Sequence, residues 1–430
     1  MHYPVSSLEV ATVGNTARES RICCLDLDTF FVSVERLFRP DLIGKPVVVG
    51  ALPGSRGVVT AASYEVRALG VRSGMPIAEA CRLAPKAIYL SGRHGEYGEY
   101  ARRVKEILER YTPIVRTASI DEYFLDFRRC EGMYRQDGDR DDNETIERVV
   151  GEVCQTIRNE VDLPASAGIA TSRPVAKMAS NAAKPAGVRI VRAGEEWSFV
   201  EPLPCRKWPG IGPVADERLR ASGILTLGEL LTVPDSSPER SLAASLRRVV
   251  SGKAETALGR DRPSFREHDP KGLTLGSISN ESTFGHDVGD LQPIVDRLNS
   301  LCGRVCWRAR QRGILARTIT LKLRYADFET LTRARTIKAT NAENRVLTCV
   351  NKLFRDNYDG RRPVRLVGIA LSGLEEGTSQ LELLFDEGER PRIAKALDAV
   401  RGRFGYEAIR LGLEQRSRRH IRKPTQGPTK

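Results

Sequence analysis

Two pairs of carboxylates end short apolar runs, and they limit what this chain can fold into more than any other feature. Asp26 and Asp28 close the run RICCLDLD, which predicts a short buried strand with both carboxylates on one face. Asp121 and Glu122 stand between Ile120 and the apolar run YFL. A carboxylate in such surroundings is costly to bury unless it is paired or bound to a metal ion. Taken alone, Asp26 and Asp28 could equally lie at a strand end in water.

If the two strands are neighbours, Asp26, Asp121 and Glu122 converge at one end of a sheet. Carboxylate oxygens suit hard cations, and no His stands near these acids, which favours Mg²⁺ over zinc. Two Mg²⁺ ions about 4 Å apart can activate an attacking oxygen and stabilise a leaving phosphate. The spacing therefore indicates two-metal phosphate chemistry, but it does not specify the substrate.

The excess positive charge lies in the last third of the chain. Residues 1–270 hold 38 Lys and Arg against 37 Asp and Glu, whereas residues 271–430 hold 30 against 18. These two parts contribute +1 and +12 to the formal net charge of +13. Clusters of Lys and Arg bind phosphates by releasing counterions, so a nucleic acid is the expected partner. A solubilising surface is the alternative, but it would normally spread its charge over the whole chain.

The length of 430 residues predicts two to four domains. No stretch approaches the roughly 20 apolar residues of a membrane span, and the N-terminus lacks a secretory signal, so we expect a cytoplasmic protein. Among the nine cysteines only Cys302 and Cys306 are closely spaced, and no second Cys or His pair follows at zinc-site spacing. We therefore expect reduced, mostly buried thiols.

Apolar periodicity predicts the main elements. In the first half of the chain these are strands at 21–27, 45–49, 119–127 and 164–170, and helices at 75–86, 96–110, 145–160 and 173–183. The acidic, glycine-containing segment 131–144 is expected to be an exposed loop. Short helices follow from about residue 208 to 259. The rest reads as a βαββαβ unit of α+β type and a last helix, at 274–284, 290–312, 315–325, 329–338, 342–356, 363–372 and 390–403.

Four stretches, in this order, resemble motifs of the Y-family DNA polymerases, most of all those of the DinB (DNA polymerase IV) branch. They are DLDTFF at 26–31, SYEVR at 63–67, SIDE at 119–122 and AKPAG at 183–187. The resemblance spans about residues 21–373 and implies a multidomain α+β fold, the right-hand polymerase. Its expected parts are a flexible leader (1–20), a palm (21–30 and 93–191), small fingers (31–92), a helical thumb (192–259), a linker (260–273), a βαββαβ little finger (274–373) and a C-terminal tail (374–430).

The resemblance also assigns the metal ligands. Asp26, Asp121 and Glu122 would be the catalytic residues that bind two Mg²⁺ ions, or Mn²⁺ in their place, and the Leu27 carbonyl would be a further ligand. Asp28 belongs to the motif but is not expected to touch a metal ion directly. Spacing alone does not make this distinction between Asp26 and Asp28.

Five residues match positions that hold the incoming nucleotide, namely Phe30, Phe31, Tyr64, Arg67 and Lys184. Arg offers a fork and Lys a point charge to phosphate oxygens, although each would singly pass for a surface residue. Phe31 matches the family's steric gate, an aromatic ring that would collide with a ribose 2′-hydroxyl. Packing in the core is the alternative for Phe31.

Two positions depart from the family pattern. Ala61 stands where many relatives have a Thr, although Thr60 is adjacent, and this puts one phosphate contact in doubt. Tyr123 replaces a common Ala, which is expected to alter the packing beside the metal ions. Neither departure removes a metal ligand.

Two regions are expected to hold DNA. The turn PGIG at 209–212 resembles a helix-hairpin-helix element, in which Gly210 and Gly212 let backbone N–H groups approach a phosphate. Residues 301–370 hold 16 Lys and Arg against 5 Asp and Glu, and such contacts position a duplex without reading its sequence. The cations that we expect to contact DNA are Arg304, Arg308, Arg310, Arg312, Arg317, Lys322, Arg324, Arg333, Arg335 and Lys338.

The stretch QLELLF at 380–385 resembles the peptide by which bacterial polymerases dock on a sliding clamp. An extended segment with apolar anchors can fill a groove on a partner, and the expected anchors are Gln380, Leu381, Leu383, Leu384 and Phe385. A strand that packs on its own protein is the alternative, because helix 390–403 has an apolar face to cover.

The expected reaction is attack of a primer 3′-hydroxyl on a paired dNTP, by a low-fidelity polymerase for translesion synthesis without proofreading. It would act on primer–template DNA as a monomer in the bacterial cytoplasm, at the nucleoid. One alternative is a non-catalytic accessory paralogue that binds DNA, which should have lost one or more of the metal acids. Another is a transferase that makes a small signalling nucleotide, which needs no basic grip on a duplex.

Overall fold

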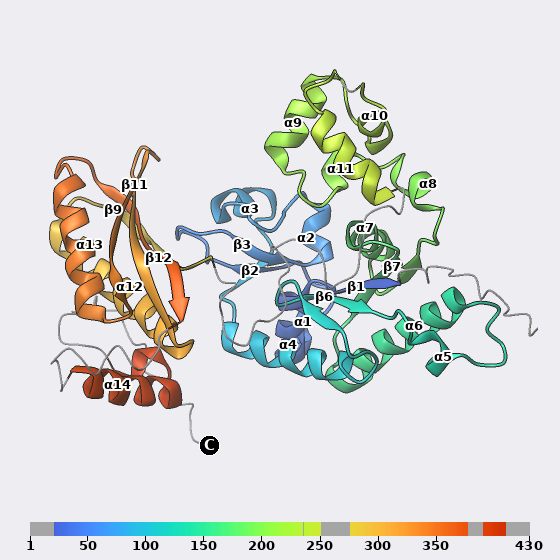
Figure 1. Cartoon of the computed structure of the whole chain (residues 1–430), viewed down its shortest axis with the longest axis horizontal. Helices are drawn as coiled ribbons and strands as arrows, with labels where there is room; N and C mark the ends of the chain where they lie inside the picture. Colours follow the sequence, from blue (N-terminus) through green and yellow to red (C-terminus); the bar gives the residue numbers. More distant parts are fainter. Residues whose placement is uncertain (1–20, 235, 251–275, 377–389, 410–430) are drawn as a thin grey trace, which may run out of the picture. The chain divides into compact units, whose positions relative to one another are not determined.

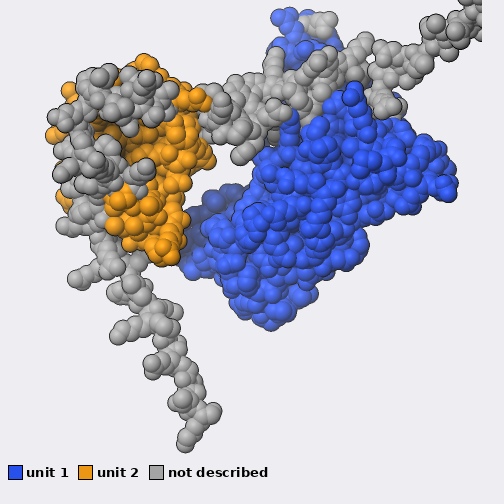
Figure 2. All heavy atoms as spheres, turned by 60° about the horizontal axis from the view of Figure 1, so that its bottom comes forward, with its two compact units in different colours: residues 1–267 blue, residues 268–430 orange. Residues whose placement is uncertain are grey.

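The computed structural model describes residues 21–234, 236–250, 276–376 and 390–409. The chain divides into two compact units, residues 1–267 and residues 268–430 (Figure 1, Figure 2). The division falls within the segment 260–273 that the sequence predicts as a linker. Within the described ranges, no helix is both long and apolar enough to cross a membrane.

A five-stranded sheet with the order β5-β6-β1-β7-β8 forms the centre of the first unit. Neighbouring strands are antiparallel, except that β7 and β8 are parallel. The two acid-bearing strands, β1 and β6, are direct neighbours, which is the condition for a shared site. The strands are β1 (Ile22–Leu27), β5 (Val115–Thr117), β6 (Glu122–Asp126), β7 (Ala165–Ala170) and β8 (Val188–Ile190).

Side chains of β1 alternate between two cores because successive residues of a strand point to opposite faces. Cys23 and Leu25 join the core that contains residues of α4 (His94–Leu108) and α6 (Asp142–Val161). Ile22 and Cys24 join the core that contains residues of α7 (Arg173–Ala183). Figure 1 shows α7 on one side of the sheet and α4 and α6 on the other. By the same alternation Asp26 belongs to the α7 side.

Helix α7 lies very close to the sheet. A Cβ atom at Gly168 of β7 would stand 2.1 Å from the Ser180 nitrogen and 2.2 Å from the Ala176 carbonyl oxygen. Only glycine fits there, and α7 presents small residues to it. This contact fixes the position of α7 relative to β1, the neighbour of β7.

A three-stranded sheet with the order β3-β2-β4 and three helices form a smaller part of the first unit. Its core joins strand residues such as Val48 and Val59 to Val66 of α2 and Ile77 of α3. Helix α1 begins three residues after β1 ends, so the chain runs directly from Asp26 on β1 into this smaller part. The elements are α1 (Phe30–Phe38), β2 (Val47–Gly50), β3 (Val59–Ala62), α2 (Tyr64–Ala68), α3 (Ile77–Leu83) and β4 (Ile88–Leu90).

Short helices complete the first unit, as the sequence predicts from residue 208 onward. They are α8 (Glu196–Val200), α9 (Pro213–Ala221), α10 (Leu227–Leu231) and α11 (Arg240–Val250). Leu227 and Leu246 belong to the same apolar core as Val175 of α7. A capping box of Thr226 and Glu229 satisfies backbone N–H groups at the start of α10.

The second unit has the predicted βαββαβ order. Its antiparallel sheet has the strand order β11-β10-β12-β9, and α12 and α13 pack on one face. Ile319, Leu321 and Leu323 of β10 face these helices, so the residues between them lie on the opposite face. The elements are β9 (Ser277–Val288), α12 (Leu291–Gln311), β10 (Ile314–Tyr325), β11 (Thr330–Thr340), α13 (Glu343–Asn357) and β12 (Val364–Glu376).

A last helix, α14 (Arg390–Phe404), is held against α12 by polar contacts. The Arg310 guanidinium donates to both carboxylate oxygens of Asp398, at 2.6 and 2.9 Å. Arg401 is 1% exposed, and its guanidinium carbon lies 4.4 Å from the centroid of the Tyr406 ring. The ring of Tyr406 in turn contacts Trp307 of α12 at 5.5 Å.

The segment 131–144 is a mostly exposed loop in its middle, at residues 135–141, but its two ends are helical. It contains α5 (Glu131–Tyr134), and α6 begins at Asp142. Glu131 is 6% exposed and forms an ion pair with Arg21 at 2.8 Å. Asp141 caps α6 by accepting a hydrogen bond from the Glu144 N–H. The prediction therefore holds for the middle of the segment and was wrong at its ends, where acids bind an arginine and a helix end.

The cysteines are free thiols, and seven of the nine are buried. Burial raises the pKa of Cys23, Cys24 and Cys302 well above the usual value. They therefore stay protonated at neutral pH and act as small apolar residues of the core.

Candidate active site

The pairing of β1 with β6 brings the acids together. Asp26 and Glu122 are directly opposite each other in the antiparallel register, and the Leu27 N–H donates to the Asp121 carbonyl at 2.9 Å. Asp26 and Glu122 lie on the face of the sheet that α7 covers. The Asp121 side chain stands just before β6 and accepts a hydrogen bond from the Ser119 hydroxyl.

Lys177 of α7 and Lys184, which directly follows the helix, neutralise two of these carboxylates. The Lys184 ammonium donates to Asp26, and the Lys177 ammonium donates to Glu122. Burial raises the pKa of Asp26; Lys184 opposes this shift, and the charges of Asp121 and Glu122 add to it. Burial lowers the pKa of Lys177, but its hydrogen bond to Glu122 and the charge of that carboxylate raise it above its usual value overall. The site therefore holds concentrated negative charge that needs cations.

The residues present fit a hard divalent cation by their chemistry. Three carboxylates on adjacent strand ends repel one another, and oxygen ligands of this kind suit Mg²⁺. Among the described residues, no group of three or more Asp, Glu, His or Cys side chains is already arranged to hold a metal ion. In this structure the ammonium groups of Lys177 and Lys184 take carboxylate oxygens that such an ion would need.

Asp28 is buried and its carboxylate is fully used by protein groups. One oxygen accepts from the Tyr64 hydroxyl at 3.1 Å, and the other accepts from the Ser166 hydroxyl at 2.7 Å and the Ala186 N–H at 2.8 Å. The Lys184 ammonium lies 3.7 Å away. Asp28 thus connects β1 to β7, to α2 and to the turn after α7, which agrees with the expectation that it is not a metal ligand.

Tyr64 and Arg67 lie on α2 and contact each other. The Arg67 guanidinium carbon lies 5.3 Å from the centroid of the Tyr64 ring, and its Nε donates to the Ala62 carbonyl at 2.9 Å. Burial and the charge of Asp28 raise the pKa of Tyr64, so its hydroxyl remains a donor. The structure therefore brings Tyr64 and Lys184 to the same carboxylate, that of Asp28.

Phe31 is half-buried, and its ring stacks on Tyr97 with centroids 4.2 Å apart. Tyr97 is fully buried and donates a hydrogen bond to Glu35 at 2.7 Å. Phe31 therefore has a rigid support behind one face of its ring. Phe30 is 3% exposed and belongs to the core, so its side chain is not free to contact a nucleotide, and only its backbone remains a candidate.

Tyr123 follows Glu122 on β6, and burial together with the charge of Asp121 raises its pKa. It points to the opposite face of β6 from Glu122, and its hydroxyl donates to the Ala101 carbonyl of α4 at 2.9 Å. Strand alternation turns the Tyr123 ring away from Glu122 and toward α4, and its effect on packing beside the metal ions stays a prediction. Ala61 is buried in β3, whereas Thr60 is exposed.

The PGIG turn has the geometry that a phosphate contact needs. Ile211 is buried in the core, Gly210 has φ +102°, and Gly212 precedes the first turn of α9. A Cβ atom at Gly210 or Gly212 would meet nothing within 4 Å, so the backbone there faces open space. A left-handed φ at Gly210 is the conformation that favours glycine.

The predicted cations of the second unit are not equivalent. Arg312, Arg317, Arg333, Arg335 and Lys338 are exposed, whereas Arg304, Arg308, Lys322 and Arg324 are half-buried. Several of them already have partners within the unit, such as Glu375 for Arg317 and Glu281 for Lys322, at 2.7 and 2.8 Å. Arg310 is the clear correction: its bidentate bond to Asp398 and its 15% exposure give it a structural role in holding α14.

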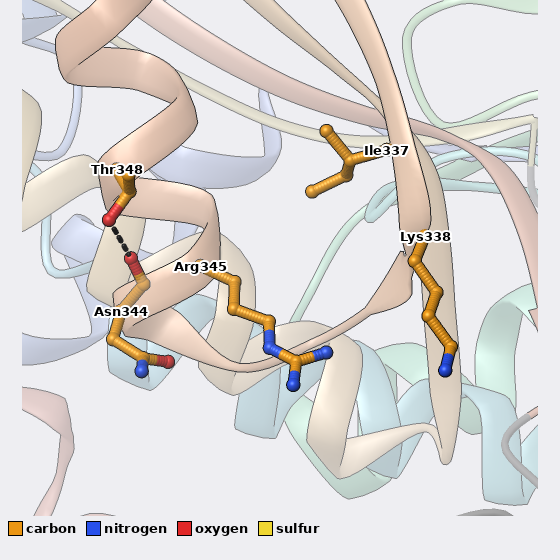
Figure 3. Close-up of a pocket in the computed structure, with 5 residues that line it drawn as sticks. All are labelled: Ile337, Lys338, Asn344, Arg345 and Thr348. Atoms are coloured by element: carbon orange, nitrogen blue, oxygen red, sulfur yellow. Dashed lines mark hydrogen bonds between the residues drawn. The ribbon is translucent and has the colours of Figure 1, made fainter.

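A small hollow of about 270 Å³ lies between β11 and the start of α13 (Figure 3). The pairing of β11 with β10 is irregular here, because Ala316 pairs with Thr340 whereas Thr318 pairs with Thr336. Such a bulge re-aims side chains at an edge strand. The hollow is lined by Ile337, Lys338, Asn344, Arg345 and Thr348. Arg345 therefore lines the same hollow as Lys338, and it was not among the cations that the sequence analysis expected to contact DNA.

Sequence reasoning also missed Lys177, because nothing in the sequence distinguishes it from other lysines. Lys177 lies inside the predicted helix 173–183, and Lys184 is the residue that follows it. The proposed clamp peptide, residues 380–385, lies outside the described residues.

Known proteins share this fold and these motifs. The impB/mucB/samB family matches residues 25–181, and the C-terminal domain of that family matches residues 276–383. A DNA polymerase IV of Dehalococcoides mccartyi is 35% identical over 398 residues, which cover 91% of this chain and 97% of that protein. A DNA polymerase IV of Streptomyces coelicolor is 38% identical over 358 residues, which cover 83% of this chain and 71% of that protein.

Solved structures give the same result. A Y-family DNA polymerase chimera is similar with a TM-score of 0.68 and 26% identity, covering 83% of this chain and 99% of the chimera. The structure of DinB from Sulfolobus solfataricus shares the fold, with a TM-score of 0.53 and 24% identity. The fold and the acid-bearing strands thus define a polymerase of the right-hand type. This chain belongs to the Y-family of DNA polymerases, in its DinB (DNA polymerase IV) branch.

Proposed function

We propose that this protein is a DNA-directed DNA polymerase that copies damaged templates at low fidelity, by two-metal nucleotidyl transfer from a dNTP to a primer 3′-hydroxyl. The observation that carries the proposal is the pairing of Asp26 with Glu122 on adjacent strands, with Asp121 beside them. Full-length relatives named DNA polymerase IV support the reaction. No support exists for a non-catalytic paralogue, because all three acids are present and brought together.

In this proposal Asp26, Asp121 and Glu122, together with the Leu27 carbonyl, hold two Mg²⁺ ions, for which Mn²⁺ can substitute. When bound, the ions lower the pKa of the primer hydroxyl and stabilise the charge that develops on the leaving pyrophosphate. The family implies dependence on a divalent metal ion; the number of ions and the ligand set are our proposal.

The chain's own residues would position the nucleotide. Lys184 lies on Asp26 in this structure, and we propose that its ammonium binds the triphosphate once the acids hold metal ions. Tyr64 and Arg67 would contact the same phosphates from α2, since they already lie together near Asp28. Phe31, supported from behind by Tyr97, would exclude a ribose 2′-hydroxyl.

We assign polymerase parts to the observed elements as follows. The five-stranded sheet with α4, α6 and α7 is the palm, and the three-stranded sheet with α1, α2 and α3 is the small fingers. Helices α8 to α11 are the thumb, and the βαββαβ sheet with α12 and α13 is the little finger. Small fingers give an open site, which supports tolerance of damaged templates.

DNA would be held by backbone N–H groups of the thumb turn and by cations of the little finger. Gly210 and Gly212 face open space. The side chains of Arg312, Arg333 and Arg335 are exposed and are not part of the core. Solved relatives include an "insertion ternary complex" of Dbh DNA polymerase, which supports DNA and a nucleotide as substrates. We propose that the protein acts on DNA as a monomer at the bacterial nucleoid.

A templating assay tests the proposed function. Purified protein is given a primer–template, Mg²⁺ and each dNTP in turn, on an intact template and on one with an abasic site. We expect incorporation of the complementary dNTP, some misincorporation, extension past the lesion, and no excision of a mismatched primer end. Incorporation that ignores the template, or no incorporation at all, would contradict the proposal.

We further propose that residues 380–385 dock on a sliding clamp. The sequence QLELLF supports this, because it combines a glutamine with apolar anchors that can fill a groove on a partner. Replacing Leu383, Leu384 and Phe385 by Ala should remove clamp-stimulated synthesis and leave clamp-free synthesis intact. Loss of clamp-free synthesis would instead indicate that the segment packs on its own protein.

A further inference from the structure

One cation at the acids has no task in the proposed reaction. Lys177 lies in the second turn of α7, and its ammonium donates to Glu122. The Glu122 side chain is 10% exposed and that of Lys177 is 37% exposed. Lys184 makes the matching contact with Asp26, but Lys184 is already assigned to the triphosphate.

We propose that Lys177 is a built-in counter-cation of the metal-free active site, whose ammonium holds Glu122 until a divalent metal ion takes that carboxylate. This inference rests on the proposed function, because it assumes that Glu122 is a metal ligand. It makes Lys177 a positioning residue, since it acts on the reaction only through Glu122.

The need for such a cation follows from the charge of the site. Asp26, Asp121 and Glu122 stand on two paired strands, and each carboxylate raises the free energy of its neighbours' charge. Without a cation this repulsion opposes the pairing of β1 with β6. Ammonium groups on Glu122 and Asp26 remove most of the negative charge while no metal ion is present.

The packing of α7 explains why Lys177 reaches Glu122. The helix approaches the sheet at Gly168, where even a methyl group would overlap the backbone of Ala176 and Ser180. Cys24 lies opposite both Gly168 and Phe124, and Phe124 is two residues from Glu122 on the same face of β6. The helix therefore cannot slide away, and the root of the Lys177 side chain stays near this carboxylate.

The partial exposure of Lys177 explains how its ammonium can release Glu122 when a metal ion binds. A partly exposed lysine keeps a route to solvent, and its flexible stem allows the ammonium to leave Glu122 without moving α7. A metal ion and the ammonium compete for the same oxygen, Oε2 of Glu122.

Two readings of Lys177 predict different behaviour. A counter-cation stabilises the metal-free protein, weakens metal binding, and contributes little once metal is bound. A purely structural ion pair stabilises both states equally and leaves metal affinity unchanged. The measurement must therefore compare the protein with and without metal ions.

The test uses the full chain with Lys177→Met, which keeps the length of the side chain and removes the charge. Affinity for Mn²⁺ is measured by electron paramagnetic resonance, and the melting temperature is measured in EDTA and in saturating Mn²⁺. We expect about two- to five-fold tighter Mn²⁺ binding, the range set by the small net energy of a partly exposed ion pair. We expect a lower melting temperature in EDTA and a smaller difference from wild type in Mn²⁺.

Control variants separate this effect from general electrostatics. Lys86→Met removes an exposed charge between α3 and β4 and should change neither quantity. In a Glu122→Gln background, Lys177→Met should no longer lower the melting temperature in EDTA. If it still does so, or if Mn²⁺ binds Lys177→Met with unchanged or lower affinity, the inference is wrong. If the wild type itself binds no Mn²⁺, the proposed function fails instead.

Discussion

Asp28 illustrates at the scale of single residues how a buried carboxylate can organise a site without binding a metal ion. Its oxygens accept hydrogen bonds from Tyr64, Ser166 and the Ala186 N–H, which come from three separate segments. Tyr64 and the segment that carries Lys184 are the proposed triphosphate contacts. In the proposed reaction, Asp28 would therefore set the distance between two groups that bind the same nucleotide.

Asp28→Asn tests this role. The amide group would place two N–H donors where the carboxylate now accepts from Ser166 and Ala186, and leave at least one donor unsatisfied. We expect a loss of about 1–3 kcal/mol in the free energy of unfolding and a raised KM for the dNTP. Urea unfolding and steady-state kinetics measure these quantities. An unchanged KM would show that Asp28 supports the fold without positioning the nucleotide.

Phe31→Ala tests the steric gate. The Phe31 ring stacks on the buried Tyr97 ring, so a ribose 2′-hydroxyl that meets it cannot push it aside. We expect the variant to raise kcat/KM for ribonucleotides at least tenfold relative to deoxyribonucleotides, which is about 1.4 kcal/mol of lost discrimination. Rejection of ribonucleotides that stays at the wild-type level would return Phe31 to a packing role.

Among the secondary-structure elements, helix α7 matters most for the site, because its position determines where Lys177 and Lys184 lie relative to the acids. Gly168→Ala places a methyl group within 2.2 Å of the α7 backbone. We expect destabilisation of about 3 kcal/mol or more, since backbone cannot move aside as a side chain can. Gly151→Ala is the matched control: it lies in α6 with nothing within 4 Å and should gain about 0.5–1 kcal/mol. Equal effects in urea unfolding would contradict the close packing.

The sequence predicted long, strongly periodic elements well. Helix α7 has the bounds that the pattern predicts, and α12, α13 and β10 differ by a residue at an end. The elements that it missed are short: α1, α2, β3 and β4 contain few turns or residue pairs from which to read a period. The ends of the segment 131–144 were misjudged because charge looks the same in a sequence whether water or an arginine neutralises it.

The residues of the candidate site also differ in how far the sequence indicates them. Asp26, Asp121 and Glu122 could be found because carboxylates in apolar strands are costly and conspicuous. Lys177 could not be ranked above other lysines from the sequence. Its importance comes from its contact with Glu122 of β6, which lies more than 50 residues earlier in the chain. Arg310 was placed on DNA by charge alone, whereas the fold turns it toward Asp398.

At the scale of the whole molecule, the two units carry different chemistry. The first contains the acids and is almost neutral, with 38 positive and 36 negative side chains in residues 1–267. The excess positive charge belongs to residues 271–430. Such a division separates catalysis from the sequence-independent grip on a phosphate backbone, which suits an enzyme whose template supplies all specificity.

Arg345→Gln tests a contact with a DNA phosphate that the sequence alone did not predict. Arg345 lines the hollow beside Lys338, and we expect it to contact a DNA phosphate. The variant should bind primer–template more weakly and reduce the salt dependence of binding by about one phosphate contact. Arg355→Gln removes the same charge from the far part of α13 and should leave that dependence unchanged. A titration at several salt concentrations that shows equal slopes for both variants would refute this contact.

The central claim is that the acids joined by β1 and β6 catalyse DNA synthesis. Its most direct test is single-nucleotide primer extension with Mg²⁺ and the paired dNTP, comparing wild type with Glu122→Ala after both are shown to bind the primer–template equally. We predict that the wild type extends the primer and that Glu122→Ala loses at least about a hundredfold in rate, as expected when a charge-stabilising group is removed from a reaction centre. Equal extension by the two proteins would contradict the claim.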